Sequence, residues 1–267
     1  MKISVITVVY NNAKTVEEAI LSVLEQTYKN IEYIVIDGGS TDGTLEILHK
    51  YKGKIAILVS EKDNGIYDAM NKGVKLATGD LIYFLNSDDK FYDKTVVEDV
   101  VKVAEQNKHI DFFYGGVVCK NIFRGESENV FLKRISDFKI KLGQNIKQQS
   151  LFACRTAFTQ VGLFVPKYKV SADYEWECRL VKANKKGLFV RRIIAVYAQT
   201  GFSSKGSWSQ YIEKYNIIRM HFGLLYGVTF YLRSIFKYLI VLILKKMKLA
   251  SFVSKIANKI RRTSLKN

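Results

Sequence analysis

Along the first part of the chain, continuous apolar runs alternate with stretches in which apolar residues recur every three or four positions. The apolar runs predict four strands, at Ile3–Val9, Ile31–Ile36, Ile55–Ser60 and Leu81–Leu85. The helical spacing predicts a helix after each strand: one that opens at a Thr15–Glu18 capping box, then Leu45–Tyr51, Ile66–Ala77, and one that Asp93 caps and that runs to about Gln106.

Four strand-and-helix units in succession predict a Rossmann-like α/β fold, with a mostly parallel central sheet and helices on both faces. Ligands of such sheets bind at the carboxyl ends of the strands. Polar clusters follow three of the strands: Asn11-Asn12, Asp37 and Asp88-Asp89. We therefore expect a ligand site at this edge of the sheet.

Beyond residue 111 the pattern is more mixed. It predicts a helix at Asp173–Ala183 and a strand at Leu188–Ala198. Pro166 is the only proline and no Pro/Ser-rich linker divides this part from the first, so both are expected to form one catalytic unit.

Each acidic candidate has a functional and a purely structural interpretation. Asp88-Asp89 could bind a hard divalent cation or form a turn before a helix. Asp37 could accept a hydrogen bond from a nucleotide base or close an Asx turn. Asp173 could act as a general base or cap its helix, with Glu175 and Glu177 as neighbouring alternatives to it.

The charge of the chain is unevenly placed. The formal net charge is +17, and residues 200–267 carry 13 Lys/Arg against the single acid Glu213, a net of +12. This asymmetry predicts an anionic surface as a partner of the last quarter of the chain.

Cysteine usage and the N-terminus both favour the cytoplasm. Cys119, Cys154 and Cys178 have no metal-ligand spacing, and we expect reduced, buried thiols. The apolar run at 3–10 is too short for a signal peptide and is interpreted as the first strand.

Four segments resemble glycosyltransferase family 2 in order and spacing. They are ISVITVVYN (3–11), VIDGGSTDGT (35–44), DNGIYDAMNKG (63–73) and FLNSDD (84–89). The resemblance covers about residues 2–205. It implies an inverting enzyme with the GT-A fold, of the kind that builds bacterial capsule, O-antigen or exopolysaccharide.

The resemblance also implies how the donor is bound. Asp37 would contact the nucleotide base, commonly uracil, in a pocket shaped by Val8 and Tyr10. Asp68, in the segment between the second and third motifs, would add a nucleotide contact. The second acid of the usual paired motif is Gly38 here, so Asp37 would serve alone.

For catalysis, the resemblance implies that Asp88-Asp89 is the metal-binding motif for Mn or Mg. Asp89 would be the more direct ligand, with Asp88 near the ribose and diphosphate. Asp173 would be the general base. Residues 148–150 (QQS) resemble an acceptor-side motif that often reads His-Gln-Ser, and residues 201–203 (GFS) resemble a loop near the diphosphate.

The segment 206–267 is expected to form a basic, amphipathic helical region after a catalytic domain at 1–205. Its apolar stretch at 222–244 contains Arg233 and Lys237, which would be costly inside a spanning helix of ~20 apolar residues. We expect it to lie in the membrane interface, with basic residues toward anionic lipid. The apolar face would comprise Phe230, Leu232, Ile235, Phe236, Leu239 and Ile240. The alternative is a packed helix followed by a solvated basic tail.

Together these features predict transfer of a sugar from a nucleotide sugar, a UDP-sugar, to a hydroxyl of a glycan or lipid-linked acceptor. The process would be surface polysaccharide or lipopolysaccharide synthesis, at the inner face of the cell membrane. A catalytically inactive, membrane-associated nucleotide-sugar binder is the alternative. A dehydrogenase is excluded because no G-x-G-x-x-G follows the first strand. A nucleic-acid partner is not expected, since the basic residues cluster in an apolar tail.

Overall fold

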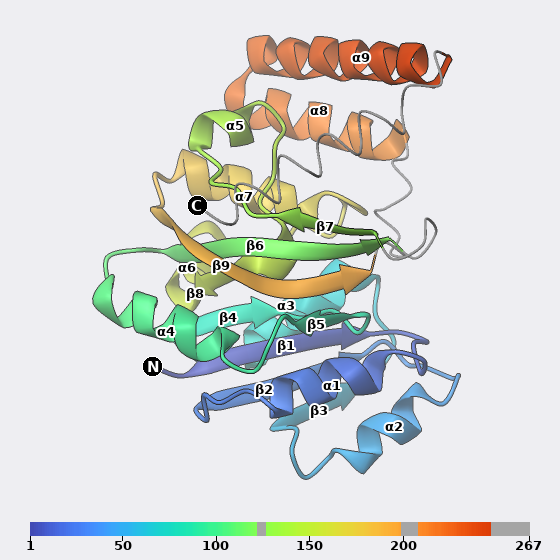
Figure 1. The fold of residues 1–267 in the computed structure, drawn as a ribbon, viewed down its shortest axis with the longest axis vertical. Coiled ribbons are helices and arrows are strands. Elements are labelled where there is room, and N and C mark those ends of the chain that lie inside the picture. The colour runs from blue at the N-terminus through green and yellow to red at the C-terminus, as the bar shows by residue number, and fades with distance from the viewer. Residues whose placement is uncertain (122–126, 199–207, 247–267) are drawn as a thin grey trace.

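The chain folds around one sheet flanked by helices, in a computed structural model that describes residues 1–121, 127–198 and 208–246 (Figure 1). The strands are β1 (Ile3–Val9), β2 (Ile31–Asp37), β3 (Ile57–Ser60), β4 (Leu81–Phe84), β5 (Asp89–Phe91), β6 (Phe112–Asn121), β7 (Ser127–Phe131), β8 (Leu151–Cys154) and β9 (Gly187–Ala198). The helices are α1 (Val16–Leu24), α2 (Thr44–Lys50), α3 (Ile66–Leu76), α4 (Val96–Gln106), α5 (Asp137–Lys141), α6 (Arg155–Val161), α7 (Ala172–Lys182), α8 (Trp208–Phe222) and α9 (Leu224–Lys246), with a 3-10 helix η2 (Gln148–Ser150).

The strand order is β3-β2-β1-β4-β8-β6-β9-β5, with β7 paired to β6. Strands β3, β2, β1 and β4 are all parallel. Beyond them β8 is antiparallel to both β4 and β6, while β6 and β9 are parallel. The predicted α/β fold with a mostly parallel central sheet is confirmed, and its parallel strands are those of the first hundred residues.

Two hydrophobic cores cover the two faces of this sheet. Side chains alternate between them along each strand, as a strand period of two requires. In β1, Ile6 and Val8 face the core that α3, α6, α7 and α8 complete. Ile3, Val5 and Val9 face the core that α1, α2 and α4 complete. Helices therefore lie on both faces, as predicted.

Helix α3 lies very close to β1. A Cβ added to Gly73 would come within 2.5 Å of Ile6 Cγ2, so only glycine fits at this crossing. The close approach fixes the first turn of α3, which carries Tyr67, relative to the end of β1.

Two sequence predictions were wrong in local detail, and one short strand was missed. Thr15 precedes α1, but its hydroxyl donates to the Ser87 carbonyl oxygen instead of forming a capping box. The residue that precedes α4 is Thr95, and Asp93 accepts hydrogen bonds from its backbone and hydroxyl. The three-residue strand β5, which begins at Asp89, was missed because it is too short to show a period.

The C-terminal helices lie on the side of the sheet where β6 to β9 are found (Figure 1). Helix α8 packs on α7 through Ile217 and Ile218, which are fully buried. Helix α9 packs on α8, and most of its large apolar residues are exposed. Phe230 was expected on the exposed face, but it is buried against Gly143.

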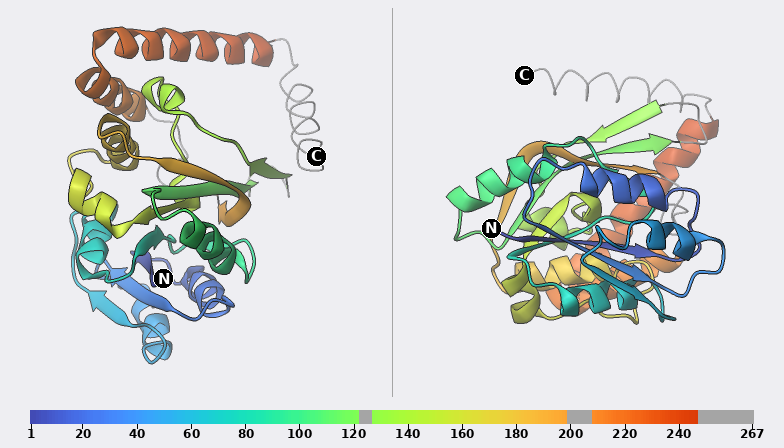
Figure 2. Two further views of the ribbon diagram at one scale, coloured as in Figure 1. Left: turned by 90° about the vertical axis from the view of Figure 1, so that its left-hand side faces the viewer. Right: turned by 90° about the horizontal axis from the view of Figure 1, so that it is seen from below.

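In the part of the chain that the structure describes, no helix has both the length and the apolar character needed to cross a membrane. Helix α9 extends along one end of the molecule (Figure 2). The expected loop at 201–203 and the basic residues after 246 lie outside the described residues.

Candidate functional site

Two asparagines tie together the loops that follow β1, β2 and β4. Asn11, with a left-handed φ of 48°, accepts a hydrogen bond from the Thr41 amide at 2.8 Å. Asn12 Nδ2 donates to Ser87 Oγ at 2.8 Å, in the loop after β4. The backbone amide of Asn12 donates to Oγ1 of Thr44, the first residue of α2, which follows the loop after β2. The predicted convergence of the three polar strand ends is therefore observed.

A cavity of about 700 Å³ opens at this edge of the sheet. Five of the predicted site residues line it: Val8, Tyr10, Asp88, Asp89 and Asp173. Residues from segments more than 160 positions apart thus come together around one space. A cavity of this size falls in the range that small-molecule ligands occupy.

Asp37 and Asp68 are predicted site residues that do not line the cavity. Asp37 is fully buried, and its carboxylate accepts hydrogen bonds from the Gly39 amide, from Ser40 and from Ser60 Oγ at 2.6 Å. Asp68 accepts one from the Asn64 amide at 3.0 Å. Both carboxylates stabilise loops beside the cavity, and their contacts with a nucleotide stay predictions.

Asp63 lies in the cavity wall, although the sequence analysis gave it no role. A Cβ added to Gly38 would lie 2.5 Å from Asp63 Oδ2 and 3.3 Å from the Tyr10 ring. The Asp63 carboxylate therefore stands beside position 38, where the family motif usually has its second acid. No sequence pattern indicates this proximity, because 25 residues separate positions 38 and 63 and only the fold brings them together.

The Asp88-Asp89 pair has oxygen atoms suited to a hard cation. Asp89 is buried, and its Oδ2 accepts a hydrogen bond from Asn86 Nδ2 at 3.0 Å. The carbonyl oxygen of the same side chain, Asn86 Oδ1, is buried and has no hydrogen-bond partner among the described residues.

No group of three or more His, Cys, Asp or Glu side chains in the described ranges could hold a metal alone. Magnesium-type ions commonly need only one or two carboxylates and complete their shell with substrate phosphates and water. The residues at 86–89 therefore fit an ion that binds together with a diphosphate.

Asp173 is the second residue of α7 and is held by Tyr67 of α3. The Tyr67 hydroxyl lies 3.1 Å from Asp173 Oδ1 and also 3.1 Å from the Val170 carbonyl oxygen. Burial, with the Asp173 charge, raises the pKa of Tyr67 well above its usual value, so the phenol keeps its proton and donates it.

The two alternative acids on α7 have other surroundings. Burial alone would raise the pKa of Glu175, but hydrogen bonds from His221 and Arg179 outweigh it and lower this pKa. Glu177 is buried, and burial raises its pKa well above the usual value. Neither of these two side chains is among the residues that line the large cavity.

Three lysines that the sequence analysis did not single out also line the cavity: Lys147, Lys169 and Lys214. Lys214 comes from α8, and its Nζ donates to Asn145 Oδ1 at 3.2 Å and lies over the Tyr174 ring. Burial lowers the pKa of Lys214, although the charges of Asp173 and Glu177 oppose this shift. The cavity therefore combines carboxylates and ammonium groups.

A model of the family described as "Glycosyl transferase family 2" matches residues 4–160, more than half of the chain. The chain belongs to glycosyltransferase family 2. This confirms the resemblance found in the sequence, and it identifies the chain as a glycosyltransferase.

Curated relatives agree with this assignment. A "PGL/p-HBAD biosynthesis glycosyltransferase" of Mycobacterium bovis is 32% identical over 184 residues, which covers 66% of this chain and 68% of the relative. An uncharacterized glycosyltransferase of Mycobacterium tuberculosis is 39% identical over 207 residues, covering 76% and 77%.

Solved structures share the fold of this glycosyltransferase. S. aureus TarS superposes with a TM-score of 0.66 at 20% identity, over 82% of this chain and 39% of TarS. TarS 1-349 in complex with UDP-GlcNAc gives 0.65 at 19% identity. The mannosyltransferase PcManGT of Pyrobaculum calidifontis, in complex with GDP-Man and Mn2+, gives 0.62, and 63% of that chain is covered. The chain thus spans less than two-thirds of each of these structures.

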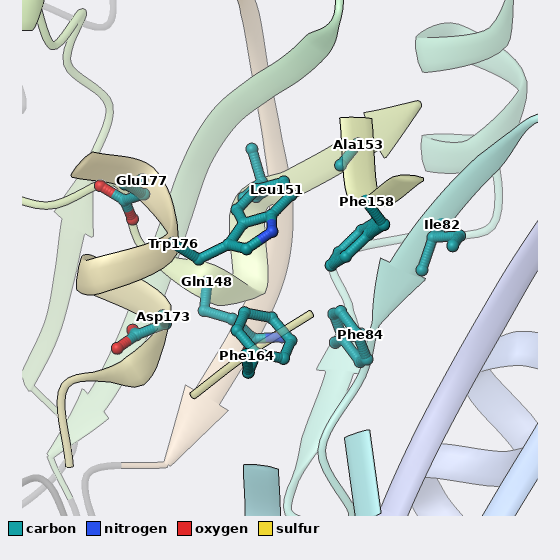
Figure 3. Close-up of a pocket in the computed structure, with 10 residues that line it drawn as sticks. All are labelled: Ile82, Phe84, Gln148, Leu151, Ala153, Phe158, Phe164, Asp173, Trp176 and Glu177. Carbon is teal, nitrogen blue, oxygen red and sulfur yellow. The ribbon is translucent and has the colours of Figure 1, made fainter. Parts of the chain in front are cut away.

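A second cavity, of about 10 Å³, lies between α7 and the strands β4 and β8 (Figure 3). It has room for one water molecule. Asp173 and Glu177 lie one helical turn apart in its wall, and Gln148 faces them from η2. Gln148 Nε2 is buried without a hydrogen-bond partner among the described residues. The cavity is otherwise lined by aromatic and aliphatic side chains, which explains why Glu177 favours its neutral form.

We predict that Glu177→Gln removes a pH-dependent loss of stability. Because the folded-state pKa of Glu177 is raised, the unfolded chain releases this proton first, and stability falls as pH rises from about 4.5 toward the folded value. Each unit of the raised pKa corresponds to about 1.4 kcal/mol. Urea unfolding at pH 5 and pH 8 should show a smaller decline for the variant. The same decline in both proteins would contradict the prediction.

Proposed function

We propose that this glycosyltransferase moves a sugar from a nucleotide sugar, a UDP-sugar, to a hydroxyl of a glycan or lipid-linked acceptor, with inversion at the anomeric carbon. The observation that carries the proposal is the single cavity lined by Asp88, Asp89 and Asp173 in a family 2 chain. Solved structures of the same fold hold UDP-GlcNAc and GDP-Man, which supports a nucleotide-sugar donor.

On the donor side, Val8 and Tyr10 are proposed to contact the base, with Asp37 beneath them. The Tyr10 ring is exposed at the cavity wall and available for stacking on a base. Asp63 lies in the loop before α3, and Asp68, in the first turn of α3, accepts a hydrogen bond from the Asn64 amide of that loop. We propose that this loop contributes to the recognition of the base and ribose.

Asp88 and Asp89 are the residues that would hold a manganese or magnesium ion, which would neutralise charge on the diphosphate. The unpartnered Asn86 Oδ1 beside them supports this assignment. Lys147 and Lys214 line the same cavity and can add positive charge toward a departing diphosphate.

The proposed step is one in-line displacement. The Asp173 carboxylate accepts the proton of the acceptor hydroxyl while that oxygen forms a bond to the anomeric carbon. The bond from the anomeric carbon to the phosphate oxygen breaks, and its electron pair leaves with the nucleoside diphosphate. Tyr67 holds the Asp173 carboxylate through Oδ1.

We propose that the acceptor belongs to bacterial surface polysaccharide synthesis and is met at the inner face of the cell membrane. Helix α9 supports a lipid surface as partner. It exposes Leu232, Ile235 and Phe236, and it carries Arg233 and Lys237 beside them. An amphipathic helix with basic residues binds anionic interfaces through both features.

Asp173→Asn should abolish transfer but retain donor binding, because an amide cannot accept a proton at neutral pH. The expected loss of turnover is about 10²- to 10⁴-fold. Release of UDP from UDP-sugars gives the turnover, and calorimetry with UDP gives the affinity. Asp137→Asn, at an exposed acid on α5, is the matched control and should keep wild-type turnover.

Near wild-type turnover of Asp173→Asn would show that another group is the base. A wild-type chain that binds UDP and UDP-sugars but never turns over would favour the inactive binder.

Asp89→Ala should remove most of the metal dependence of UDP binding while the protein stays folded. In wild type, UDP should bind at least about tenfold more tightly with Mn²⁺ than with EDTA, since the ion bridges carboxylates and phosphates. The variant should show a difference of about twofold or less by calorimetry. Equal wild-type affinities with and without metal would contradict the proposed metal site.

Full-length protein should sediment with anionic vesicles at low salt and less so at high salt. Each Lys or Arg near the surface contributes about 1 kcal/mol, which salt screens. The double substitution Leu232→Ser with Phe236→Ser should weaken binding further by exposing polar groups on α9. Ile212→Ser, at an exposed position on α8, is the control. Wild-type protein that stays in the supernatant at low salt would favour a packed helix with a solvated tail.

A further inference from the structure

Glu213 of α8 binds the backbone that leads into α7. Its Oε1 accepts a hydrogen bond from the Lys169 amide at 2.9 Å, and its Oε2 accepts bonds from the Val170 and Ser171 amides at 3.1 and 3.0 Å. Glu213 is also the only acid in residues 200–267, where positive charge prevails. Three consecutive amides that point at one carboxylate form a specific anion-binding turn.

This contact lies at the start of α7, which has no side-chain cap of its own. Ser171 occupies the N-cap position, where a serine hydroxyl commonly accepts hydrogen bonds from the first turn. Here Ser171 makes no such cap, and its buried Oγ has no hydrogen-bond partner among the described residues. The carboxylate of Glu213, from another helix, instead lies at the positive end of α7, where a negative charge is favourable.

The same backbone positions Asp173. Both backbone polar groups of Val170 are bound: its amide donates to Glu213, and its carbonyl oxygen lies 3.1 Å from the Tyr67 hydroxyl. That hydroxyl also lies 3.1 Å from Asp173 Oδ1. A shift of the Val170 peptide would therefore displace the group that orients the Asp173 carboxylate.

Helix α8 is itself firmly placed on α7. His221 Nε2 lies 3.0 Å from Glu175 Oε1, and Ile217 is fully buried between these contacts. Lys214, next to Glu213, lines the large cavity. Contacts through Glu213 in the first half of α8 and through His221 near its C-terminal end thus hold it against the start and the first turn of α7.

We propose that Glu213 is a positioning residue for the base Asp173, so that the catalytic unit continues through α8 and beyond the expected boundary at 205. This role rests on the proposed function, because it takes Asp173 as the base. Glu213 touches neither donor nor acceptor in this role; it fixes the backbone from which the base projects.

The test compares full-length wild type with Glu213→Ala, Glu213→Gln and the control Asn216→Ala, an exposed position on α8. UDP release from UDP-sugars gives kcat and the donor KM, and amide hydrogen exchange follows residues 169–171. In Glu213→Ala, kcat should fall about 10²-fold, the effect expected for a base displaced by about 1 Å, with donor KM unchanged within about twofold. The three amides should exchange at least about tenfold faster.

Glu213→Gln should give an intermediate kcat, because its single carbonyl oxygen can accept at most two of the three hydrogen bonds. It also tests the role if Glu213→Ala fails to fold. Asn216→Ala should match wild type in every measurement. Faster exchange with wild-type kcat would show that Glu213 only stabilises this turn, and it would overturn the inference. Unchanged exchange would also overturn it.

A fall in UDP affinity together with kcat would also overturn it, because the donor side should not respond. A wild-type chain that releases UDP from no UDP-sugar would instead overturn the proposed function, and this role with it. Wild-type turnover in Glu213→Ala would overturn this role alone.

Discussion

The placement of β1 between β2 and β4 is the constraint on which the rest of the structure depends. Every residue of β1 is buried, and its side chains alternate between the two cores. A slip of one residue would exchange the two faces and place Thr7 where Ile6 now packs against Gly73. The register also sets Val9 opposite Asp37 and Ile6 opposite Phe84, so the loops after all three strands meet at one edge. The short side chains of Asn11 and Asn12 are then long enough to connect these loops by hydrogen bonds.

Helix α7 shows how one short segment places three carboxyl groups in three different environments. Glu175 makes hydrogen bonds with Arg179 and His221, and these contacts lower its pKa. Glu177 faces an apolar interior that favours its neutral form. Asp173 alone of the three lines the large cavity, with Tyr67 as its hydrogen-bond donor. Helical spacing explains part of this difference: Asp173 and Glu177, four residues apart, share one face of α7 and line the same small cavity, while Glu175 lies on another face against Arg179 and His221.

The sequence predicted features that depend on local periodicity and missed those that depend on contacts between distant segments. Continuous apolar strands and helical spacing located the first four strand-and-helix units, and parallel pairing then implied that Asn11-Asn12, Asp37 and Asp88-Asp89 would meet at one edge of the sheet. Aspartates in turns were harder to interpret, because Asp37 satisfies its own loop through Ser40 and Ser60. Asp63 and Glu213 gave no local signal, since their importance arises from neighbours 25 and more than 40 positions away.

The two sides of the cavity are built in physically different ways. The residues proposed to bind the donor, Val8, Tyr10, Asp88 and Asp89, belong to strands or lie next to them, and the hydrogen bonds of the sheet fix the backbone of Val8 and Asp89. The proposed base, Asp173, lies on α7, where Tyr67 of α3 contacts its carboxylate and Glu213 of α8 contacts the backbone that precedes it. The family match at 4–160 ends before α7 and α8 begin. Under the proposed function, a donor scaffold inside the matched region would therefore be combined with a base that lies on a helix outside it. Such a division would allow the acceptor side to change without disturbing the strands that bind the donor.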